Sequence, residues 1–247
     1  QARDGQGQVV GLVAEPGMGK SRLVYEFRRS LAGERVTYLE GRCLSFGASI
    51  PYLPVLDIVR ANCGITPIDA AEEVAEKARF ALEEVGMDGG EGTPYLLHLM
   101  GVREGTDALA GLSPEAIKAR IFEIVRQLAL NGSRKRPIIL NVEDLHWIDS
   151  TSEELFASLV ESLSGAAILL LCTYRPGYRP PWIDLSYSTQ LSLRQLNDAD
   201  ASSVVRSVLG AQTAADSVMR LILDRAEGNP FFLEELAATL AVAREDG

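Results

Sequence analysis

Residues 8–23 read QVVGLVAEPGMGKSRL, and this stretch decides the fold. A short apolar run over residues 9–13 meets a turn rich in proline and glycine, which ends in Gly19-Lys20-Ser21. An amphipathic helix is predicted to follow over residues 21–31, because apolar side chains recur there at helical spacing. Strand, glycine loop and helix in this order are typical of a phosphate-binding loop.

The residue types of this loop suit a polyphosphate. Gly17 and Gly19 allow backbone N–H groups to approach phosphate oxygens, and the helix that follows directs the positive end of its dipole to the same place. Lys20 is predicted to reach the β- and γ-phosphates, and the hydroxyl of Ser21 to bind Mg²⁺. Ala14 stands where the pattern prefers glycine, which the loop tolerates if this residue keeps a negative φ. The predicted nucleotide contacts are Glu15, Pro16, Gly17, Met18, Gly19, Lys20, Ser21 and Arg22.

Two acids follow a second apolar run, since residues 138–144 read IILNVED. One carboxylate is predicted to hold Mg²⁺ and the other to polarise the attacking water. Register along the strand gives Glu143 the metal position and Asp144 the catalytic position. The usual pair in such nucleotide hydrolases has Asp before Glu, so the reversed order here leaves the two roles open. The shorter Asp side chain predicts slow turnover, and the candidate metal ligands are Ser21, Glu143 and Asp144.

Arg175 follows another apolar run, in the segment CTYRPG at residues 172–177. This strand is predicted to lie between the first and the third strands of the sheet, so that its end would point at the γ-phosphate. A cation there could sense or stabilise phosphate charge. The alternative is a loop arginine that pairs with a surface acid.

Composition restricts the classes of function. The chain has 247 residues, of which 47% are hydrophobic, and a net charge of −10. This length suits one large core or a main domain with a smaller one appended. An acidic chain is a poor candidate for binding nucleic acids or anionic membranes, because phosphates are neutralised by clustered Lys and Arg. The short basic run at 134–136 is predicted to be a solvated loop, and no apolar run is long enough to span a membrane.

The cysteines indicate a reducing compartment. They are three in number, widely spaced and without a CxxC motif, which predicts reduced core thiols in a cytoplasmic protein. No signal peptide is evident. Because the chain opens at Gln1 and ends within a helical pattern, we expect it to be a piece of a longer polypeptide.

Alternating strands and helices predict an α/β fold with a five-stranded parallel sheet flanked by helices. The predicted strands are residues 8–14, 36–41, 137–143, 167–174 and 189–193, and the helices before the last strand are residues 21–31, 53–62, 67–85, 114–130 and 152–163. The glycine-rich stretch 87–93 is predicted to be a mobile loop. Helices over 198–208, 214–226 and 231–243 then form a small C-terminal subdomain. The predicted domains are therefore a nucleotide-binding core at 1–193 and a helical lid at 194–247.

With these residues in hand, the chain resembles the STAND-type, AAA-like ATPase module of large bacterial signalling proteins. It is especially similar to modules that follow a class III adenylate/guanylate cyclase domain and precede tetratricopeptide repeats. The segments that carry the resemblance are the phosphate loop, YLEGRCLSFGASIPYLPVLDIVR, ILNVEDLHWIDSTSEELF, LLLCTYRPGY and EGNPFFLEEL.

The resemblance implies a role for each matched position. Lys20 and Ser21 correspond to the Walker A motif, Glu143 and Asp144 to the Walker B acids, and Arg175 to a sensor-like arginine. Gly228-Asn229-Pro230 corresponds to the GxP motif, whose proline lies near adenine in relatives. The implied ligands are ATP or ADP with Mg²⁺, and the implied partners are other domains of the same polypeptide (a cyclase, a winged helix after residue 247, repeats) and further copies of the chain.

The expected function is a nucleotide-operated switch that closes on ATP·Mg²⁺, alters an attached output domain and is reset by slow hydrolysis. Two alternatives stay open at this point. A degenerate nucleotide-binding scaffold is compatible with Ala14 and the reversed acids, whereas the intact Lys20 and Ser21 oppose it. A small-molecule kinase would also use a phosphate loop, but residues 194–247 lack the aligned basic side chains of a closing lid.

Overall fold

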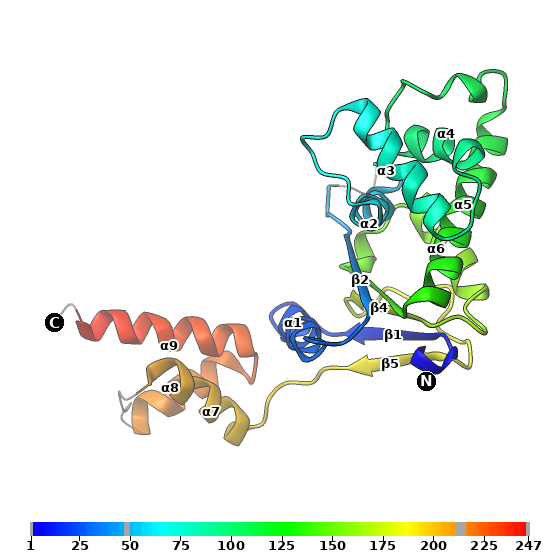
Figure 1. Cartoon of the computed structure of the whole chain (residues 1–247). Coiled ribbons are helices and arrows are strands. Elements are labelled where there is room, and N and C mark those ends of the chain that lie inside the picture. The colour runs from blue at the N-terminus through cyan, green and yellow to red at the C-terminus, as the bar shows by residue number, and fades with distance from the viewer. Residues whose placement is uncertain (1, 47–49, 211–215, 246–247) are drawn as a thin grey trace. The chain divides into compact units, whose positions relative to one another are not determined.

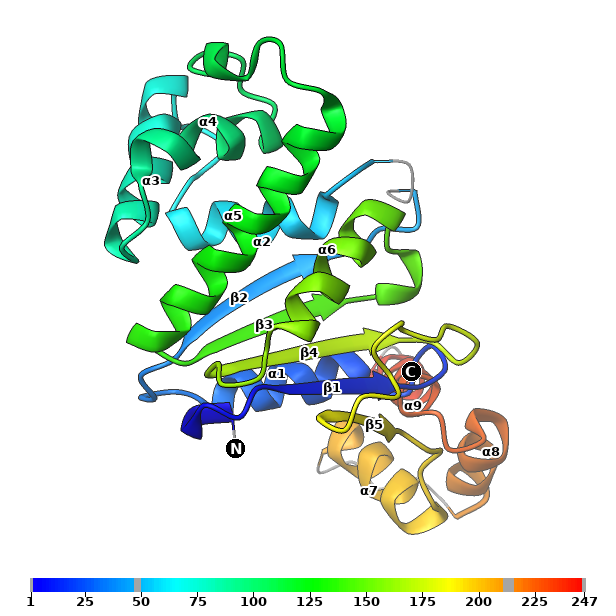
Figure 2. The ribbon, with the colours of Figure 1, turned by 90° about the vertical axis from the view of Figure 1, so that its right-hand side faces the viewer.

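The computed structural model describes residues 2–46, 50–210 and 216–245. Figure 1 shows the chain coloured from its N-terminus to its C-terminus, and Figure 2 shows the strands of its one five-stranded sheet in the order β2-β3-β4-β1-β5. The pairs β2–β3 and β3–β4 are parallel, and β4 lies between β3 and β1, as predicted for the strand that carries Arg175. The strands are β1 (Gln8–Val13), β2 (Thr37–Arg42), β3 (Ile138–Glu143), β4 (Ile168–Tyr174) and β5 (Ser188–Ser192).

Helices flank the sheet, and further helices form the C-terminal part of the chain. They are α1 (Lys20–Ser30), α2 (Leu53–Cys63), α3 (Ala71–Glu84), α4 (Gly89–Leu99), α5 (Pro114–Lys135), α6 (Ser150–Glu161), α7 (Asp198–Leu209), α8 (Asp216–Ala226) and α9 (Pro230–Glu245), with short 3₁₀ turns η1 (Ala2–Asp4), η2 (Asp107–Leu109) and η3 (Leu145–Trp147). The predicted α/β class and parallel sheet are confirmed, with most element ends within two residues of their predicted positions.

The middle of the sheet is apolar on both faces, as the unbroken hydrophobic runs predict. Ile138–Val142 of β3 are all buried, and so are all residues of β4 except Leu169. Helices α2, α5 and α6 pack their apolar side chains on one face of β2 and β3, and Figure 2 shows α5 and α6 crossing these strands. Parallel main-chain pairing of β2 with β3 and of β3 with β4 places the carboxyl ends of these strands at one edge of the sheet.

The prediction of a mobile glycine-rich loop at 87–93 is wrong, because helix α4 begins at Gly89. The Asp88 carboxylate accepts the backbone N–H of Glu91 at 3.0 Å and so caps the helix. Gly92 is buried against α3, where a Cβ would lie 2.8 Å from Cδ1 of Leu82. Gly89 and Gly92 therefore serve close packing against α3, which sequence pattern does not distinguish from a flexible loop.

Two helix boundaries also differ from prediction. Helix α3 begins at Ala71, because the backbone N–H and hydroxyl of Thr66 both donate to Asp69 at 2.8 Å and close a turn before it. Helix α5 continues to Lys135, so most of the basic run at 134–136 is helical, although its side chains are exposed as predicted. Cations in the last turn of a helix stabilise it, because they lie near the negative end of the helix dipole.

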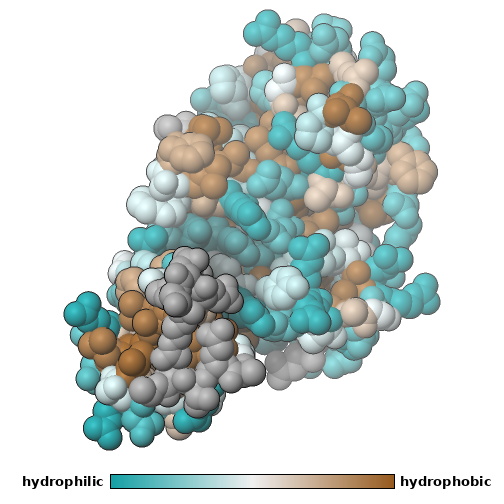
Figure 3. Space-filling view, turned by 90° about the vertical axis from the view of Figure 1, so that its left-hand side faces the viewer, coloured by the Kyte–Doolittle hydropathy of each residue, from teal (hydrophilic) through white to brown (hydrophobic). Residues whose placement is uncertain are grey.

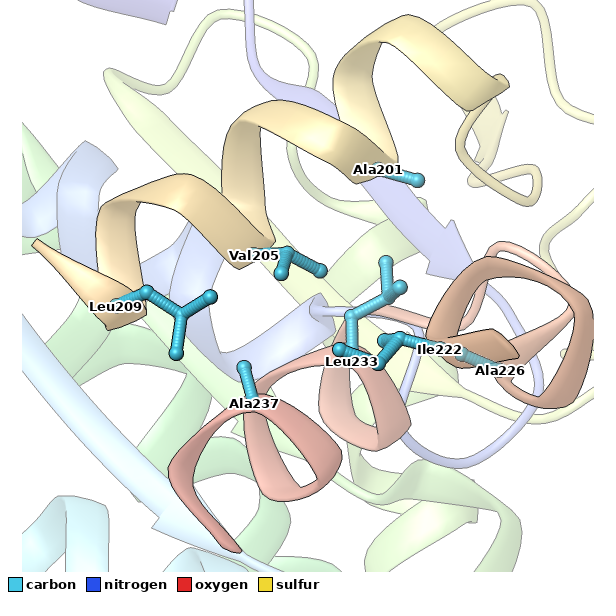
Figure 4. Packing of buried hydrophobic residues seen from close by; sticks show 7 residues of the cluster. All are labelled: Ala201, Val205, Leu209, Ile222, Ala226, Leu233 and Ala237. Atoms are coloured by element: carbon cyan, nitrogen blue, oxygen red, sulfur yellow. The ribbon is translucent and has the colours of Figure 1, made fainter. Parts of the chain in front are cut away.

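Contacts divide the chain into two compact units, each described here by itself. Unit 1 comprises residues 1–11 and 33–190, and unit 2 comprises residues 12–32 and 191–247. Unit 2 has a core of its own, in which side chains of α7, α8 and α9 point toward one another (Figure 4). These are Ala201, Val205, Leu209, Ile222, Ala226, Leu233 and Ala237. The phosphate loop belongs to unit 2, whereas the predicted division placed it with the sheet; the division at 193/194 into functional domains stays a prediction.

The face drawn in Figure 3 is of mixed hydropathy. Figure 3 shows hydrophilic side chains spread over the face drawn there, with smaller apolar patches between them.

The three cysteines, Cys43, Cys63 and Cys172, are buried and free. Among the described residues, no helix combines the length and the apolar character needed to cross a membrane.

Candidate functional site

The phosphate loop has the backbone shape that its glycines predict. Gly17 and Gly19 have φ of 80° and 87°, in the left-handed region that favours glycine. Ala14 is not among the described residues of positive φ, so its Cβ causes no strain where the pattern prefers glycine. The loop therefore keeps its shape despite this departure from the motif.

The first turn of α1 is built to receive an anion. Gly19 is its N-cap residue and provides no side-chain hydrogen bond, and the first turn holds no acidic residue. Ordinary helices prefer acids and capping side chains at this end, where backbone N–H groups lack partners. Here the turn contains Lys20 and Arg22 instead, so its positive end is reinforced.

Lys20 is held back over the loop. Its Nζ donates to the carbonyl oxygens of Ala14 at 2.6 Å and Glu15 at 3.2 Å, and the side chain is half-buried. The backbone N–H of Met18 also donates to the Glu15 carbonyl, at 3.4 Å. These contacts hold the Lys20 ammonium group against the loop, and carbonyl oxygens are weaker partners for it than phosphate oxygens.

The remaining predicted contacts of the loop differ in exposure. Met18 is buried beneath the loop. Glu15 and Pro16 are exposed, as is Ser21 in the first turn of α1. The guanidinium of Arg22 is exposed and pairs with Glu26 at 2.8 Å, one turn further along the helix. The metal role of Ser21 stays a prediction, and Arg22 has a partner on its own helix.

A clasp within unit 2 joins the loop to the start of α9. Nδ2 of Asn229 donates to the Pro16 carbonyl at 3.1 Å, and the Phe231 backbone N–H donates to the Gly17 carbonyl at 3.2 Å. The same N–H donates to Oδ1 of Asn229 at 3.1 Å. We call these hydrogen bonds the loop–α9 clasp. Pro230 lies between its two anchoring residues, half-buried at the first position of α9.

Gly17 fits this clasp because it has no side chain. A Cβ there would lie 2.7 Å from Oδ1 of Asn229 and 3.1 Å from Cβ of Phe231. The positive φ and the close approach therefore require glycine for two independent reasons.

The acid pair lies in unit 1, where β3 ends. The Glu143 carboxyl is half-buried, and Oε2 lies 3.8 Å from Nε of Arg42 on β2. Burial raises its pKa, assisted by the charge of Glu40, while Arg42 opposes this shift. A carboxylate in this setting favours a cation beside it, which fits the predicted metal position.

Asp144 has a different environment. It is exposed and has φ 56° and ψ 42°, in the left-handed region. Its backbone N–H donates to Oγ1 of Thr173 on β4 at 3.0 Å, and its carbonyl accepts the N–H of Trp147. The two acids are therefore not equivalent, because one is partly buried beside an arginine and the other projects from a tight turn.

Arg175 directly follows β4 and is exposed. No hydrogen bond or ion pair of its side chain occurs among the described residues, whereas the nearby Arg179 pairs with both carboxylate oxygens of Asp184. The loop that carries Arg175 is anchored by Tyr178, whose hydroxyl donates to Glu153 of α6 at 2.5 Å. This arrangement opposes the alternative in which Arg175 pairs with a surface acid of this region.

The segment after the acids is anchored by Leu145, which is fully buried. His146 and Trp147 have their rings 5.1 Å apart in a tilted arrangement. Asp149 caps α6 through Ser152 and also accepts the N–H of Tyr52 at 3.3 Å. The DLHWID stretch therefore ties the end of β3 to α2 and α6.

Three residues with direct roles in this arrangement were missed from sequence. Arg42 is a charged residue at the carboxyl end of a strand, a signal that could have been used. Asn229 is the middle residue of the GxP motif, and its amide, rather than the proline alone, contacts the loop. Thr173 lies inside an apolar run. A hydroxyl residue there can make a buried hydrogen bond, but the sequence does not show whether it does.

The predicted residues thus fall into two sets. Unit 2 contains residues 15–22 and Pro230, and Pro16 and Gly17 contact the two residues that flank Pro230. Unit 1 brings Glu143 and Asp144 to the carboxyl end of β3, adjacent to the strand that Arg175 follows.

Comparison with known families gives the decisive match. The model of the family described as AAA ATPase domain matches residues 1–171, which is more than half of the chain. The chain belongs to this family. Membership implies nucleotide binding, typically with Mg²⁺, and the uncapped first turn of α1 and the oxygen ligands of the acid pair fit that group.

The relatives of this AAA ATPase domain are larger proteins. "Uncharacterized protein R02095" of Rhizobium meliloti (strain 1021) is 28% identical over 240 residues, covering 94% of the chain and 22% of that protein. The chain therefore spans about a fifth of the length of this curated relative.

Similar solved structures include a STAND protein with a tetratricopeptide repeat sensor from Pyrococcus horikoshii, with 16% identity and a TM-score of 0.46 over 94% of the chain and 27% of that protein. Drosophila ORC bound to DNA has 14% identity and a TM-score of 0.42 over 100% of the chain and 53% of the matched one. C. elegans PCH-2 has 10% identity and a TM-score of 0.44, over 100% of this chain and 63% of the matched one.

Proposed function

We propose that this chain binds ATP with Mg²⁺, hydrolyses it slowly and acts as a nucleotide-dependent signalling switch. The observation that carries the proposal is the loop–α9 clasp. Within unit 2, it joins the segment predicted to bind phosphate to helix α9, which packs in the core formed by α7, α8 and α9. If the loop moves when nucleotide binds, its hydrogen bonds to the start of α9 would therefore change.

The clasp supports a switch rather than a passive binding site. The Pro16 and Gly17 carbonyls bind α9, while the Ala14 and Glu15 carbonyls accept Lys20. A phosphate that draws Lys20 away removes its hydrogen bonds to these two carbonyls, directly before the clasp, and leaves Glu15 with the Met18 N–H alone. A ligand shifts a conformational equilibrium only through its different affinity for the two states, and this shared loop provides that difference.

Roles within the proposed site follow the motifs. Lys20 and the loop N–H groups would bind phosphates, Ser21 and Glu143 would hold Mg²⁺, and Asp144 would orient the attacking water. Arg175, which has no described side-chain partner, would respond to phosphate charge. Pro230 would lie near adenine. Mg²⁺, when bound, would neutralise charge on the transferring phosphate.

The output of the switch belongs to the wider polypeptide. We infer that the chain works inside a larger cytoplasmic signalling protein, with an attached domain such as an adenylate cyclase, and that it associates with other domains or copies of itself. The chain covers 22% of the Rhizobium relative, which supports only the larger size of the polypeptide. The strain-free Ala14 removes one argument for a degenerate scaffold.

Calorimetric titration of the chain with ATP and ADP, with and without Mg²⁺, tests the proposal. Wild type should bind ATP in a Mg²⁺-dependent manner, and Lys20→Ala should reduce the affinity at least about 100-fold, since charged hydrogen bonds to phosphate are lost. Arg29→Ala is the matched control, because it removes an exposed cation of the same helix that pairs with Glu26 at 3.5 Å. Absence of binding by wild type, or equal binding by Lys20→Ala, would reject the proposal.

A further inference from the structure

The backbone of the acid pair is held from both neighbouring strands. The Glu143 carbonyl accepts the N–H of Cys43, at the end of β2, at 2.9 Å. The Asp144 N–H donates to Oγ1 of Thr173 on β4 at 3.0 Å. Glu143 is therefore fixed by main-chain pairing, and Asp144 by the side chain of Thr173.

The hydroxyl of Thr173 continues the sheet where main-chain pairing ends. The register between β3 and β4 runs from Ile138 opposite Ile168 to Val142 opposite Cys172. Thr173 is the first residue of β4 beyond this ladder, and it is only 3% exposed. The chain turns away from the sheet at Asp144, and its N–H would lose its sheet partner without the threonine hydroxyl.

This turn has an intrinsic cost that the hydrogen bond offsets. Asp144 is one of three non-glycine residues of positive φ in the described part of the chain. Such a conformation is uncommon for residues with a Cβ, although Asp tolerates it better than most. An alternative conformation at Asp144 would redirect its carboxylate, since φ and ψ at this residue set the direction of its Cβ.

From this geometry we infer that Thr173 is a positioning residue for Asp144. It fixes the left-handed conformation that aims the carboxylate, without touching nucleotide itself. The inference rests on the proposed function, in which Asp144 orients the attacking water. Displacing a catalytic group by about 1 Å commonly costs about 100-fold in rate.

A pair of substitutions at one position tests this. Thr173→Val keeps the shape and strand preference of the side chain but removes the hydroxyl, whereas Thr173→Ser keeps the hydroxyl. Thr173→Val should lower kcat for ATP hydrolysis about 10- to 100-fold with KM and ATP affinity within about twofold. Thr173→Ser should stay within about threefold of wild type in kcat, on the same principle.

Two further measurements separate positioning from a general loss of structure. Amide exchange at Asp144 should be protected in wild type and Thr173→Ser and at least about 10-fold faster in Thr173→Val, because the N–H loses its acceptor. Ser133→Ala is the matched control, since it removes a buried hydroxyl that donates to the Leu130 carbonyl at 2.7 Å in α5. It should leave kcat unchanged.

The outcomes distinguish the two levels of the argument. A wild-type chain that binds no ATP would reject the proposed function and the inference together. A chain that binds ATP but never hydrolyses it would reject the hydrolysis step of the proposed function and the inference with it. A Thr173→Val variant with wild-type kcat would overturn the inference alone. A fall in kcat shared by Thr173→Val and Ser133→Ala would also overturn it.

Discussion

Replacing Asn229 by Asp isolates the contact that we expect to transmit nucleotide binding. The Asn229 side chain has two functions in the structure, because Oδ1 accepts the Phe231 N–H in the first turn of α9 and Nδ2 donates to the Pro16 carbonyl. Aspartate keeps an oxygen for the first and places an oxygen against the Pro16 carbonyl for the second. Asn229→Ala removes both and serves as the comparison.

The expected magnitudes follow from these contacts. The lost hydrogen bond to Pro16 contributes about 0.5–1.5 kcal/mol, equivalent to about 2- to 12-fold in the equilibrium between clasped and unclasped loop. Asn229→Ala loses a helix cap as well, which costs about a further 1 kcal/mol of stability. Asn229→Asp should therefore be more stable to thermal unfolding than Asn229→Ala, although neither keeps the bond to Pro16.

Hydrogen exchange with mass spectrometry measures the coupling. In wild type, ATP·Mg²⁺ should change the exchange of the α9 segment 230–236. In Asn229→Asp this ATP-dependent change should be largely lost, while ATP affinity measured by calorimetry stays within about 10-fold, because the loop N–H groups and Lys20 are unaltered.

Full ATP-dependent change at residues 230–236 in Asn229→Asp would refute the reasoning, since the Asn229–Pro16 hydrogen bond would then not carry the signal. Equal melting temperatures for Asn229→Asp and Asn229→Ala would show that the capping oxygen of residue 229 adds no stability. They would thus refute the assignment of separate functions to the oxygen and the nitrogen of the Asn229 side chain.

The remaining predictions concern the loop, the sensor-like arginine and the thiols. Gly17→Ala should lower the melting temperature more than Gly33→Ala, because both positions have positive φ but a Cβ at Gly33 meets nothing within 4 Å; an equal loss would contradict the close approach seen at Gly17. Arg175→Ala should slow ATP hydrolysis at least about 10-fold while ADP affinity is kept; Arg179→Ala, which removes an exposed ion pair, should not, and identical rates would reject the assignment. The native thiols should resist a disulfide reagent at pH 8, because burial raises the pKa of Cys43 to about 12 and leaves about a thousandfold less thiolate than the ordinary value of 9.0 does; rapid labelling before unfolding would contradict this burial.

Local pattern was enough to predict much of this molecule. The unbroken apolar runs at 138–142 and 168–174 indicate strands buried on both faces, and the glycine loop before Lys20 requires a strand on one side and a helix on the other. The acids at the end of β3 and Arg175 after β4 follow, because the carboxyl ends of parallel strands meet at one edge of a sheet. Each of these inferences depends on residues close together in the chain.

The tertiary structure decided the features that depend on distant contacts. Helix α4 forms from a glycine-rich stretch because Gly92 packs on Leu82, and intrinsic propensity alone opposes a helix there. Arg42 comes to Glu143 only through the pairing of β2 with β3.

The clasp is the extreme case, since Asn229 and Pro16 are 213 residues apart in sequence. Sequence alone therefore determined the kind of chemistry and the class of fold, because both are encoded in short motifs and in local periodicity. Which side chains restrain that chemistry, such as Asn229 on the loop and Thr173 at Asp144, was decided by the tertiary structure, because hydrogen bonds between distant segments exist only after those segments pack together.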